Sequence, residues 1–437
     1  MQKSVYILII KYMEDNMAKV AVLGYGTVGS GVVEILNTNA ESILKKAGES
    51  IEVKSVLDLR DFPGDPVQEK IVHDIDLIIN DDEIDVVVEV MGGVEPAFTF
   101  VKRALEAGKS VCTSNKALVA AHGAELLAMA KKRSLNFMFE ASVGGGIPII
   151  RPLNQALTAD EITKITGIMN GTTNYILTKM SNEGSSYQEV LKEAQELGYA
   201  ERNPEADVEG YDAGRKMAIM SSIAFNSRVT FNQVYTEGIT KITAEDIKYA
   251  KEFGYVIKLL GLARNTPDGI EVKVHPMLID ENHPLATVRD SFNAVFVHGE
   301  ASDDTMFMGR GAGQMPTASA VMGDIIDVCR NIVHGSCGKI GCSCYKELPV
   351  KDISETKSKF FLRIEALDKQ GVLANIASVL GNNDVSIAQV VQKSRKDGVA
   401  ELVIITDVVA EKNFNDAMTV FNGLSVVKEI AGVIRVY

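Results

Sequence analysis

A glycine turn between a short hydrophobic run and a helical pattern most constrains how this chain can fold. Gly24, Gly26 and Gly29 directly follow the run Val20–Leu23 and open the helical stretch Val28–Leu36. In this context the first glycine permits a tight turn, the second lets a pyrophosphate approach the backbone, and the third allows close helix–strand packing. The helix N-terminus also favours anions. The turn predicts dinucleotide binding, with a purely structural glycine turn as the alternative.

Short β-branched runs alternate with helical stretches from Val20 to about residue 145. The strand candidates are Val20–Leu23, Ile51–Leu57, Val86–Val90, Ser110–Thr113 and Asn136–Glu140, and the helical stretches between them are Val28–Leu36, Ala97–Ala107 and Ala117–Ser134. Strands separated by helices of this length imply right-handed crossovers and a parallel sheet. We therefore expect a Rossmann-type α/β domain over 17–145, preceded by an extension over 1–16 in which Val5–Ile10 could pair as an edge strand.

Two further domains are expected after the first. Mixed helical and strand patterns over 146–336 predict a second, α+β domain. A polar linker over 337–358 precedes the order strand, helix, strand, strand, helix, strand over 359–437. This βαββαβ order is typical of a ferredoxin-like domain.

Composition narrows the class of function. The formal net charge is −13, which disfavours nucleic acid as a partner. Five cysteines in 437 residues do not make a disulfide framework, so we expect a reducing cytoplasm. The early apolar run Tyr6–Ile10 is too short to span a bilayer, so no membrane association is expected.

Two loops at predicted strand ends carry candidate binding residues. Asp58 follows the second strand, where an acceptor for a ribose 2′-hydroxyl is expected, and Arg60 nearby could instead meet a 2′-phosphate. Two solvated loop charges are an equal alternative, so NAD and NADP both remain open. Ser114 and Lys116 follow the strand that ends at Thr113, and Lys116 could pair with a substrate carboxylate or simply be solvated.

Asp212 and Lys216 are four residues apart on a predicted helix and therefore share one face. Such a pair is usually a weak surface ion pair. The same stripe carries Ala213, Ile219 and other apolar residues, so the pair should point inward, where charge is costly unless it is paired or functional. Acidic residues just upstream could bind a substrate ammonium; they are Glu201, Asp207 and Glu209.

Other polar groups give weaker signals. Gly144, Gly145 and Gly146 lie near Glu140 and offer carbonyls and a carboxylate to an alkali cation, or else form a hinge. The six histidines are scattered. Cys337, Cys342 and Cys344 could bind zinc but are better interpreted as reduced linker thiols.

Taken together, these motifs closely resemble homoserine dehydrogenase. The segments that carry the resemblance, in chain order, are Gly24–Gly29, Thr113–Lys116, Phe139–Pro148, Gly167–Asn174, Gly198–Lys216 and Gly309–Ser319. They span about Ala18 to Ser336. The last part of the chain resembles an ACT domain, a small-molecule sensor. The second strand departs from the pattern because it lacks the basic residue that many relatives carry beside the 2′-phosphate, and the extension before Met17 has no counterpart.

The resemblance implies reversible hydride transfer between NAD(P)H and L-aspartate 4-semialdehyde, which gives L-homoserine in threonine, methionine and isoleucine biosynthesis. It implies that Lys216 donates the proton and that Asp212 orients it. The implied substrate residues are Glu201, Asp207, Lys116, Tyr199, Gly171 and Thr172. The implied dinucleotide residues are Gly24, Gly26, Thr27, Val28, Gly29, Asp58, Arg60, Ser114, Lys116 and Gly313.

The resemblance also implies that 146–336 is the domain for substrate binding, catalysis and dimerisation. It further implies a sodium ion, regulation and assembly. Sodium would be held by Glu140 and by the carbonyls of Val143, Gly145 and Ile147. Threonine is the expected effector, at a turn around Gly371, and a homo-oligomer (dimer or tetramer) is expected. The alternatives are a non-catalytic amino-acid sensor with a degenerate dinucleotide fold, and phosphorylating aldehyde oxidation with Cys112 as the nucleophile.

Overall fold

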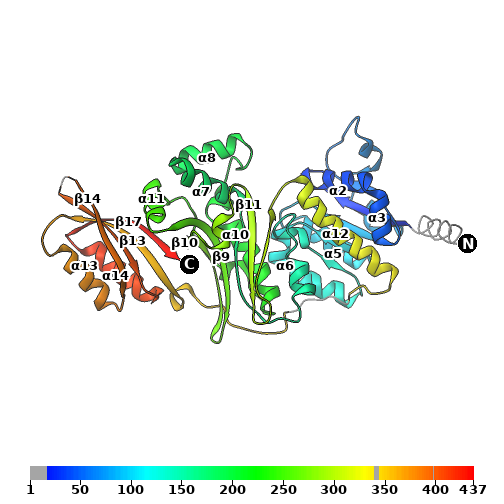
Figure 1. Ribbon diagram of the computed structural model, residues 1–437. Coiled ribbons are helices and arrows are strands. Elements are labelled where there is room, and N and C mark those ends of the chain that lie inside the picture. Colours follow the sequence, from blue (N-terminus) through cyan, green and yellow to red (C-terminus); the bar gives the residue numbers. More distant parts are fainter. Residues whose placement is uncertain (1–16, 339–343, 397) are drawn as a thin grey trace, which may run out of the picture. The chain divides into compact units, whose positions relative to one another are not determined.

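The computed structural model describes residues 17–338, 344–396 and 398–437, and its elements are labelled in Figure 1. The expected edge strand Val5–Ile10 and Cys342 lie outside the described residues. The chain forms two compact units, which are described separately. Unit 1 comprises residues 1–160, 218–230 and 307–347, and unit 2 comprises 161–217, 231–306 and 348–437.

Unit 1 is built on a six-stranded parallel sheet of strand order β3-β2-β1-β4-β5-β6. The strands are β1 (Met17–Leu23), β2 (Ser50–Leu57), β3 (Ile71–Val72), β4 (Val86–Glu89), β5 (Ser110–Thr113) and β6 (Phe137–Met138). Helices α2 (Thr27–Thr38), α3 (Ala40–Ala47), α4 (Asp76–Ile79), α5 (Ala97–Glu106) and α6 (Lys116–Lys132) connect them. The strand order reverses between β1 and β4, which is the Rossmann arrangement, so the predicted fold is confirmed.

A helix from far along the chain completes unit 1. Helix α12 (Gln314–Val333) packs on α2, and its Ala318 and Ile325 belong to the same core as Val22 of β1 and Val32 of α2. Gly31 marks the close approach, because a Cβ there would lie 2.9 Å from the Gln314 side chain. The sequence boundaries assign α12 to the second domain, whereas in the structure its apolar face is buried against the first.

Unit 2 contains a sheet of strand order β12-β11-β7-β9-β10-β17-β13-β15-β14. Its first part consists of β7 (Ile162–Ile168), β9 (Tyr255–Thr266), β10 (Gly269–Asp280), β11 (Phe292–Gly299) and β12 (Asp303–Arg310), with β8 (Tyr235–Thr236) beside β10. The associated helices are α7 (Gly171–Glu183), α8 (Tyr187–Glu196), α9 (Glu205–Val208), α10 (Tyr211–Ala224) and α11 (Ala244–Glu252). Residues 218–224 of α10 and residues 307–310 of β12 belong to unit 1.

The C-terminal part has the predicted ferredoxin-like order. Its elements are β13 (Lys357–Leu367), α13 (Val372–Asn382), β14 (Ile387–Lys396), β15 (Val399–Thr406), α14 (Glu411–Gly423) and β17 (Val427–Val436), with the short β16 (Val409–Ala410) beside β13. Strand β17 also pairs in parallel with β10, so the sheets of the two parts are continuous. Across the described residues, no helix is long and apolar enough to cross a membrane.

Candidate active site

The glycine turn leaves open space above the N-terminus of α2. Gly24 has φ +101°, a conformation that favours glycine, and a Cβ at Gly29 would lie 2.0 Å from the Gly24 carbonyl oxygen. At Gly26 a Cβ would meet nothing within 4 Å. Because α2 begins at Thr27 with no side-chain cap at Gly26, its first N–H groups face that open space.

Asp58 and Arg60 form an ion pair beside this turn. The Asp58 carboxylate accepts hydrogen bonds from the Tyr25 N–H (2.8 Å) and from Arg60 Nε and Nη2 (both 3.0 Å). The Arg60 guanidinium holds the pKa of Asp58 well below its usual range. The aspartate is therefore a fixed acceptor, and the guanidinium of Arg60 is already neutralised.

The carboxyl ends of β4 and β5 carry a buried polar group that sequence reasoning missed. Glu89, at the end of β4, accepts hydrogen bonds from Thr113 Oγ1 (2.6 Å) and the Met91 N–H (2.8 Å), and burial raises its pKa. Asn115 caps α6 by accepting the Leu118 N–H. Lys116 is therefore the first residue of α6, at the strand edge where the sequence places it, two residues after Ser114.

In unit 2 the Lys216 ammonium is buried and bonded to two acceptors. Its Nζ donates to Asp212 Oδ2 and to the carbonyl oxygen of Met169, both at 2.7 Å. Asp212 is 3% and Lys216 8% exposed, so the pair lies inside the protein rather than on a solvated helix face. The carboxylate and the carbonyl oxygen offset part of the cost of burying this cation.

Asn170 joins this pair to a second carboxylate. Its Nδ2 donates to Asp212 Oδ2 (3.0 Å) and to Asp207 Oδ1 (2.7 Å), while its Oδ1 accepts the Thr173 N–H and caps α7. Asn170 therefore fixes the spacing of Asp207 and Asp212. Sequence reasoning missed this role, although Asn170 lies within a motif that carries the resemblance.

Among the remaining predicted substrate residues, Gly171 and Thr172 lie in the first turn of α7, whereas Glu201 is exposed. Gly171 begins α7, where a Cβ would lie 2.7 Å from the Ser291 carbonyl oxygen, and Thr172 Oγ1 donates to the Tyr199 carbonyl oxygen at 2.7 Å. Glu201 is exposed between α8 and α9. Within the described ranges, no hydrogen bond or ion pair joins its carboxylate to Asp207, Asp212 or Lys216.

Family models match the chain in three segments. The homoserine dehydrogenase model covers residues 148–326, the homoserine dehydrogenase NAD-binding domain covers 24–140, and the ACT domain covers 360–425. A homoserine dehydrogenase of Bacillus subtilis is 44% identical over 96% of this chain and 98% of its own length. The chain belongs to the homoserine dehydrogenase family.

Solved structures agree with the fold of this homoserine dehydrogenase. The crystal structure of the enzyme from Thiobacillus denitrificans has a TM-score of 0.92 at 40% identity and covers 97% of this chain and 98% of that one. A hyperthermophilic archaeal homoserine dehydrogenase in complex with NADPH has a TM-score of 0.62 at 26% identity over 72% of this chain and 98% of its own. The chain is thus an NAD(P)-dependent oxidoreductase that interconverts aspartate 4-semialdehyde and homoserine.

In this homoserine dehydrogenase Glu140 caps a short stretch of backbone. Its Oε1 accepts the N–H groups of Ile149 (2.6 Å) and Ile150 (3.0 Å), and its Oε2 accepts that of Arg151 (2.6 Å). Nearby, a Cβ at Gly145 would lie 2.5 Å from the Gly311 carbonyl oxygen, which explains the glycine there. A carboxylate and backbone carbonyls are suitable donors for a hard cation, although three N–H groups already occupy the Glu140 carboxylate.

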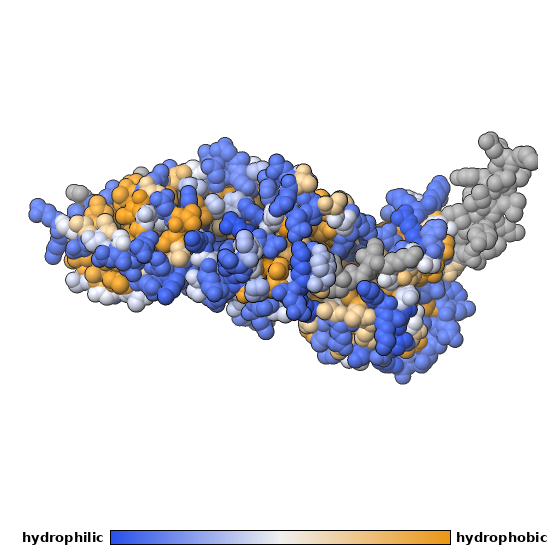
Figure 2. All heavy atoms as spheres, turned by 90° about the horizontal axis from the view of Figure 1, so that it is seen from below, coloured by the Kyte–Doolittle hydropathy of each residue, from blue (hydrophilic) through white to orange (hydrophobic). Residues whose placement is uncertain are grey.

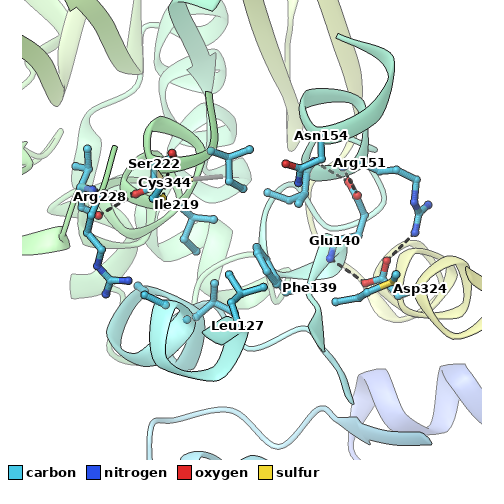
Figure 3. Close-up of a pocket in the computed structure, with 18 of the residues that line it drawn as sticks. Leu127, Phe139, Glu140, Arg151, Asn154, Ile219, Ser222, Arg228, Asp324 and Cys344 are labelled. Carbon is cyan, nitrogen blue, oxygen red and sulfur yellow. Dashed lines mark hydrogen bonds and ion pairs between the residues drawn. The ribbon is translucent and has the colours of Figure 1, made fainter. Parts of the chain in front are cut away.

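The Glu140 network lies at one end of a cavity of about 120 Å³ within unit 1. Asp324 accepts hydrogen bonds from the Glu140 N–H (2.9 Å) and Arg151 Nη2 (2.6 Å), and burial raises its pKa to about 7. Figure 3 shows Ser222 and Cys344 at the other end of the cavity. Phe139 lies between the two ends and belongs to the mostly apolar lining.

The cysteines do not support the alternative chemistries. Cys112 is buried in β5, and burial raises the pKa of its thiol well above its usual value, opposite to what a nucleophilic thiolate needs. Cys337 accepts from Asn136 Nδ2, and Cys344 donates to the Ser222 carbonyl oxygen. Among the residues that the structure describes, these cysteines belong to no group of three metal ligands.

Gly371, the predicted regulatory glycine, has φ +83° and precedes the first residue of α13. A Cβ there would meet nothing within 4 Å, and no side chain caps the helix start. Gly313 similarly precedes α12 with φ +121°, next to Gln314, which donates to Ser30 of α2.

Proposed function

We propose that Lys216 is the proton donor of this homoserine dehydrogenase and that Asp212, Asp207 and Asn170 organise its substrate. The observation that carries the proposal is the buried Lys216–Asp212–Asn170–Asp207 hydrogen-bond chain. When bound, the reduced dinucleotide supplies the hydride to the aldehyde carbon. Lys216 Nζ donates a proton to the carbonyl oxygen, which becomes the homoserine hydroxyl, and Asp212 stabilises and orients the ammonium.

The substrate ammonium is assigned to Asp207, with Glu201 as a second acidic group at the exposed edge. Asp207 is half-buried and already positioned by Asn170, whereas Glu201 is exposed. Lys116 is assigned to the substrate carboxylate, and Tyr199, Gly171 and Thr172 shape the binding loop. The test is an absorbance assay of nicotinamide reduction with L-homoserine; no homoserine-dependent reduction would refute the function.

For the dinucleotide we propose binding to Gly24, Gly26, Thr27, Val28 and Gly29, with support from Ser114 and Gly313 and with NAD preferred over NADP. Asp58 provides a fixed acceptor for a ribose 2′-hydroxyl, and its ion pair leaves Arg60 less charge for a 2′-phosphate. Asp61 and Asp65 add negative charge to the same loop. Parallel kinetics should give a higher kcat/KM with NAD; a higher value with NADP would contradict the preference.

A sodium ion, effector binding and assembly complete the proposal. The sodium donors would be the Glu140 carboxylate and the carbonyls of Val143, Gly145 and Ile147. Exchanging NaCl for choline chloride at equal ionic strength tests this sodium site, with Tm and kcat as the quantities measured. We also propose a cytoplasmic location and a homo-oligomer (dimer or tetramer). Exposed apolar side chains of the C-terminal elements, such as Leu373 and Val420, support the oligomer. Figure 2 shows hydrophobic residues gathered at the left of the view.

Threonine is proposed to bind at the turn before α13, where free N–H groups at an uncapped helix start would accept its carboxylate. Gly371→Asp should then desensitise the enzyme to threonine. Removing the whole ACT domain is a poorer test, because β17 pairs with β10 and its loss would expose a strand edge. Full-length enzyme that neither binds threonine by calorimetry nor is inhibited by it would refute this assignment.

A further inference from the structure

The two parts of the unit 2 sheet meet along a very short seam. Strands β10 and β17 share only two residue pairs, Met277 with Arg435 and Leu278 with Val436 (Figure 1). Strand β17 ends at Val436, which is paired on its other side with Lys359 of β13. At Lys273 and Val274, β10 pairs instead with β8, and residues of β10 and of the start of β13 line a cavity of about 330 Å³, the seam cavity.

The charged side chains that line this seam cavity are mostly cationic. Five basic and two acidic side chains contribute to the lining; they are Arg264, Lys273, Lys351, Lys357 and Lys359, with Glu271 and Glu355. Glu271 is already 3.9 Å from the Lys351 ammonium. The whole protein has a net charge of −13, so this local excess of positive charge has the opposite sign to the protein's overall charge.

Lys273 is the buried member of this group. Its residue is 2% exposed, and its Nζ donates to Ser358 Oγ at 3.1 Å. Ser358 Oγ in turn donates to Glu411 Oε1 at 2.7 Å, but both oxygens of Glu411 also accept hydrogen bonds from Arg435. Across the described ranges, no carboxylate lies within ion-pair distance of the Lys273 ammonium. Burial accordingly lowers the pKa of Lys273 to about 8.

Lys273 therefore differs from Lys216, whose buried charge has a carboxylate in direct contact. A buried ammonium that reaches its counter-charge only through a hydroxyl is costly unless an anion joins it. Lys273 belongs to β10, whereas Lys357 and Lys359 belong to β13. An anion that contacts lysines of both strands would therefore connect the catalytic part of the sheet to the ACT part.

We propose that the seam cavity is a binding site for a small oxyanion, a phosphate or a carboxylate, held by the Lys273 ammonium together with Lys357 and Lys359. The exposed Lys357 and Lys359 lie at the solvent side and attract the anion. The site is separate from the Lys216 cluster and from the turn at Gly371. Its occupation stabilises the folded protein, because the anion binds the folded seam and not the unfolded chain.

The test is calorimetric titration of the full-length protein with inorganic phosphate and, in a separate arm, with succinate. Saturating NAD occupies the glycine turn, and KCl keeps the ionic strength constant. Lys273→Met should weaken binding by about 10- to 100-fold, the loss of one charged hydrogen bond. Lys192→Met, which changes an exposed lysine of the same unit, should leave it unchanged. The arm with the lower Kd identifies the anion class.

Saturable binding that Lys273→Met weakens at least about 10-fold supports the site. No saturable binding in either arm overturns it, and so does binding that Lys273→Met leaves intact. If Lys273→Met does not fold, the double variant Lys357→Gln/Lys359→Gln replaces it, with the rise in Tm on phosphate addition as the readout. This double variant should lose most of that rise, and an undiminished rise would equally refute the proposal.

Discussion

The dinucleotide site and the substrate site of this enzyme offer different kinds of group to a ligand. Around Gly24–Gly29 the groups offered to a ligand belong to the backbone: open space at Gly26 and uncapped N–H groups at the start of α2. Around Lys216 they are side chains from three elements, joined by hydrogen bonds through Asn170. A backbone site binds any phosphate of the right shape, whereas a side-chain network can hold and move a proton.

The difference implies that substitutions should separate the two functions. Changes at the glycine turn should alter dinucleotide affinity, and changes in the Lys216 cluster should alter turnover. A variant that changed dinucleotide affinity and turnover equally would contradict this separation of the two functions.

The largest expected effect is on turnover. Lys216→Ala should lower kcat by about 10²- to 10⁴-fold, the usual contribution of a positioned proton donor. The dinucleotide Kd should stay within about two-fold, because Lys216 lies outside the backbone site. Steady-state kinetics and fluorescence titration with NADH measure the two quantities.

Lys258→Met is the matched control for Lys216→Ala. Lys258 is also a buried lysine of unit 2, but its Nζ donates to Asn174 Oδ1 (2.9 Å) and the Val288 carbonyl oxygen (2.5 Å), not to the acidic cluster. The folded Lys258→Met protein should keep its kcat. A comparable loss of turnover in both variants would contradict the special role of Lys216.

A branched side chain at the glycine turn should weaken dinucleotide binding. Gly26→Val should raise the dinucleotide Kd by about 10- to 100-fold, because it occupies the phosphate position and removes hydrogen bonds to a charged group. Gly423→Val is the control, since a Cβ at that glycine also meets nothing within 4 Å. Wild-type affinity in a folded Gly26→Val protein would place the phosphates elsewhere.

A smaller effect is expected at Asn170. Asn170→Ala should lower kcat/KM by about ten-fold, because Asp207 and Asp212 lose a shared hydrogen-bond donor. The variant also loses the cap of α7, so Ser186→Ala, which removes the cap of α8 alone, is the control for stability. If the two variants have equal kcat/KM, Asn170 is only a cap.

The smallest effect is on stability against pH. Burial lowers the pKa of Lys258 and of Lys273 to about 8, so the unfolded chain binds more protons than the folded protein between about pH 8 and 10. The free energy of unfolding should therefore rise with pH in this window, by at most about 1.4 kcal/mol per unit for each lysine. Urea unfolding of Lys258→Met should show about half of this slope; an unchanged slope would mean that Lys258 titrates normally.

The sequence predicts the dinucleotide half well because its signal is local. Strand, glycines and helix follow one another within 17–38, and the resulting strand order is confirmed. The pairing of Asp212 with Lys216 is predicted equally well, because helix periodicity alone places the two residues on one face. The ferredoxin-like order of 359–437 was predicted for the same reason.

The features that the sequence does not predict depend on contacts between residues far apart in the chain. The Met169 carbonyl oxygen reaches Lys216, and Asn170 reaches Asp212, each across more than forty residues, and periodicity does not carry that information. The packing of α12 on α2 joins segments 284 residues apart through Gln314 and Ser30. The acidic spacing that singled out Glu201 could not show that its side chain would be exposed.

Single-turnover hydride transfer tests the central claim most directly, because steady-state kcat can be limited by product release. Enzyme saturated with reduced dinucleotide is mixed with aspartate 4-semialdehyde, and nicotinamide absorbance is followed by stopped flow. We expect the transfer rate of Lys216→Ala to fall at least about 10²-fold below wild type while its NADH affinity is unchanged. A single-turnover rate equal to that of the wild type would contradict the assignment of Lys216 as proton donor.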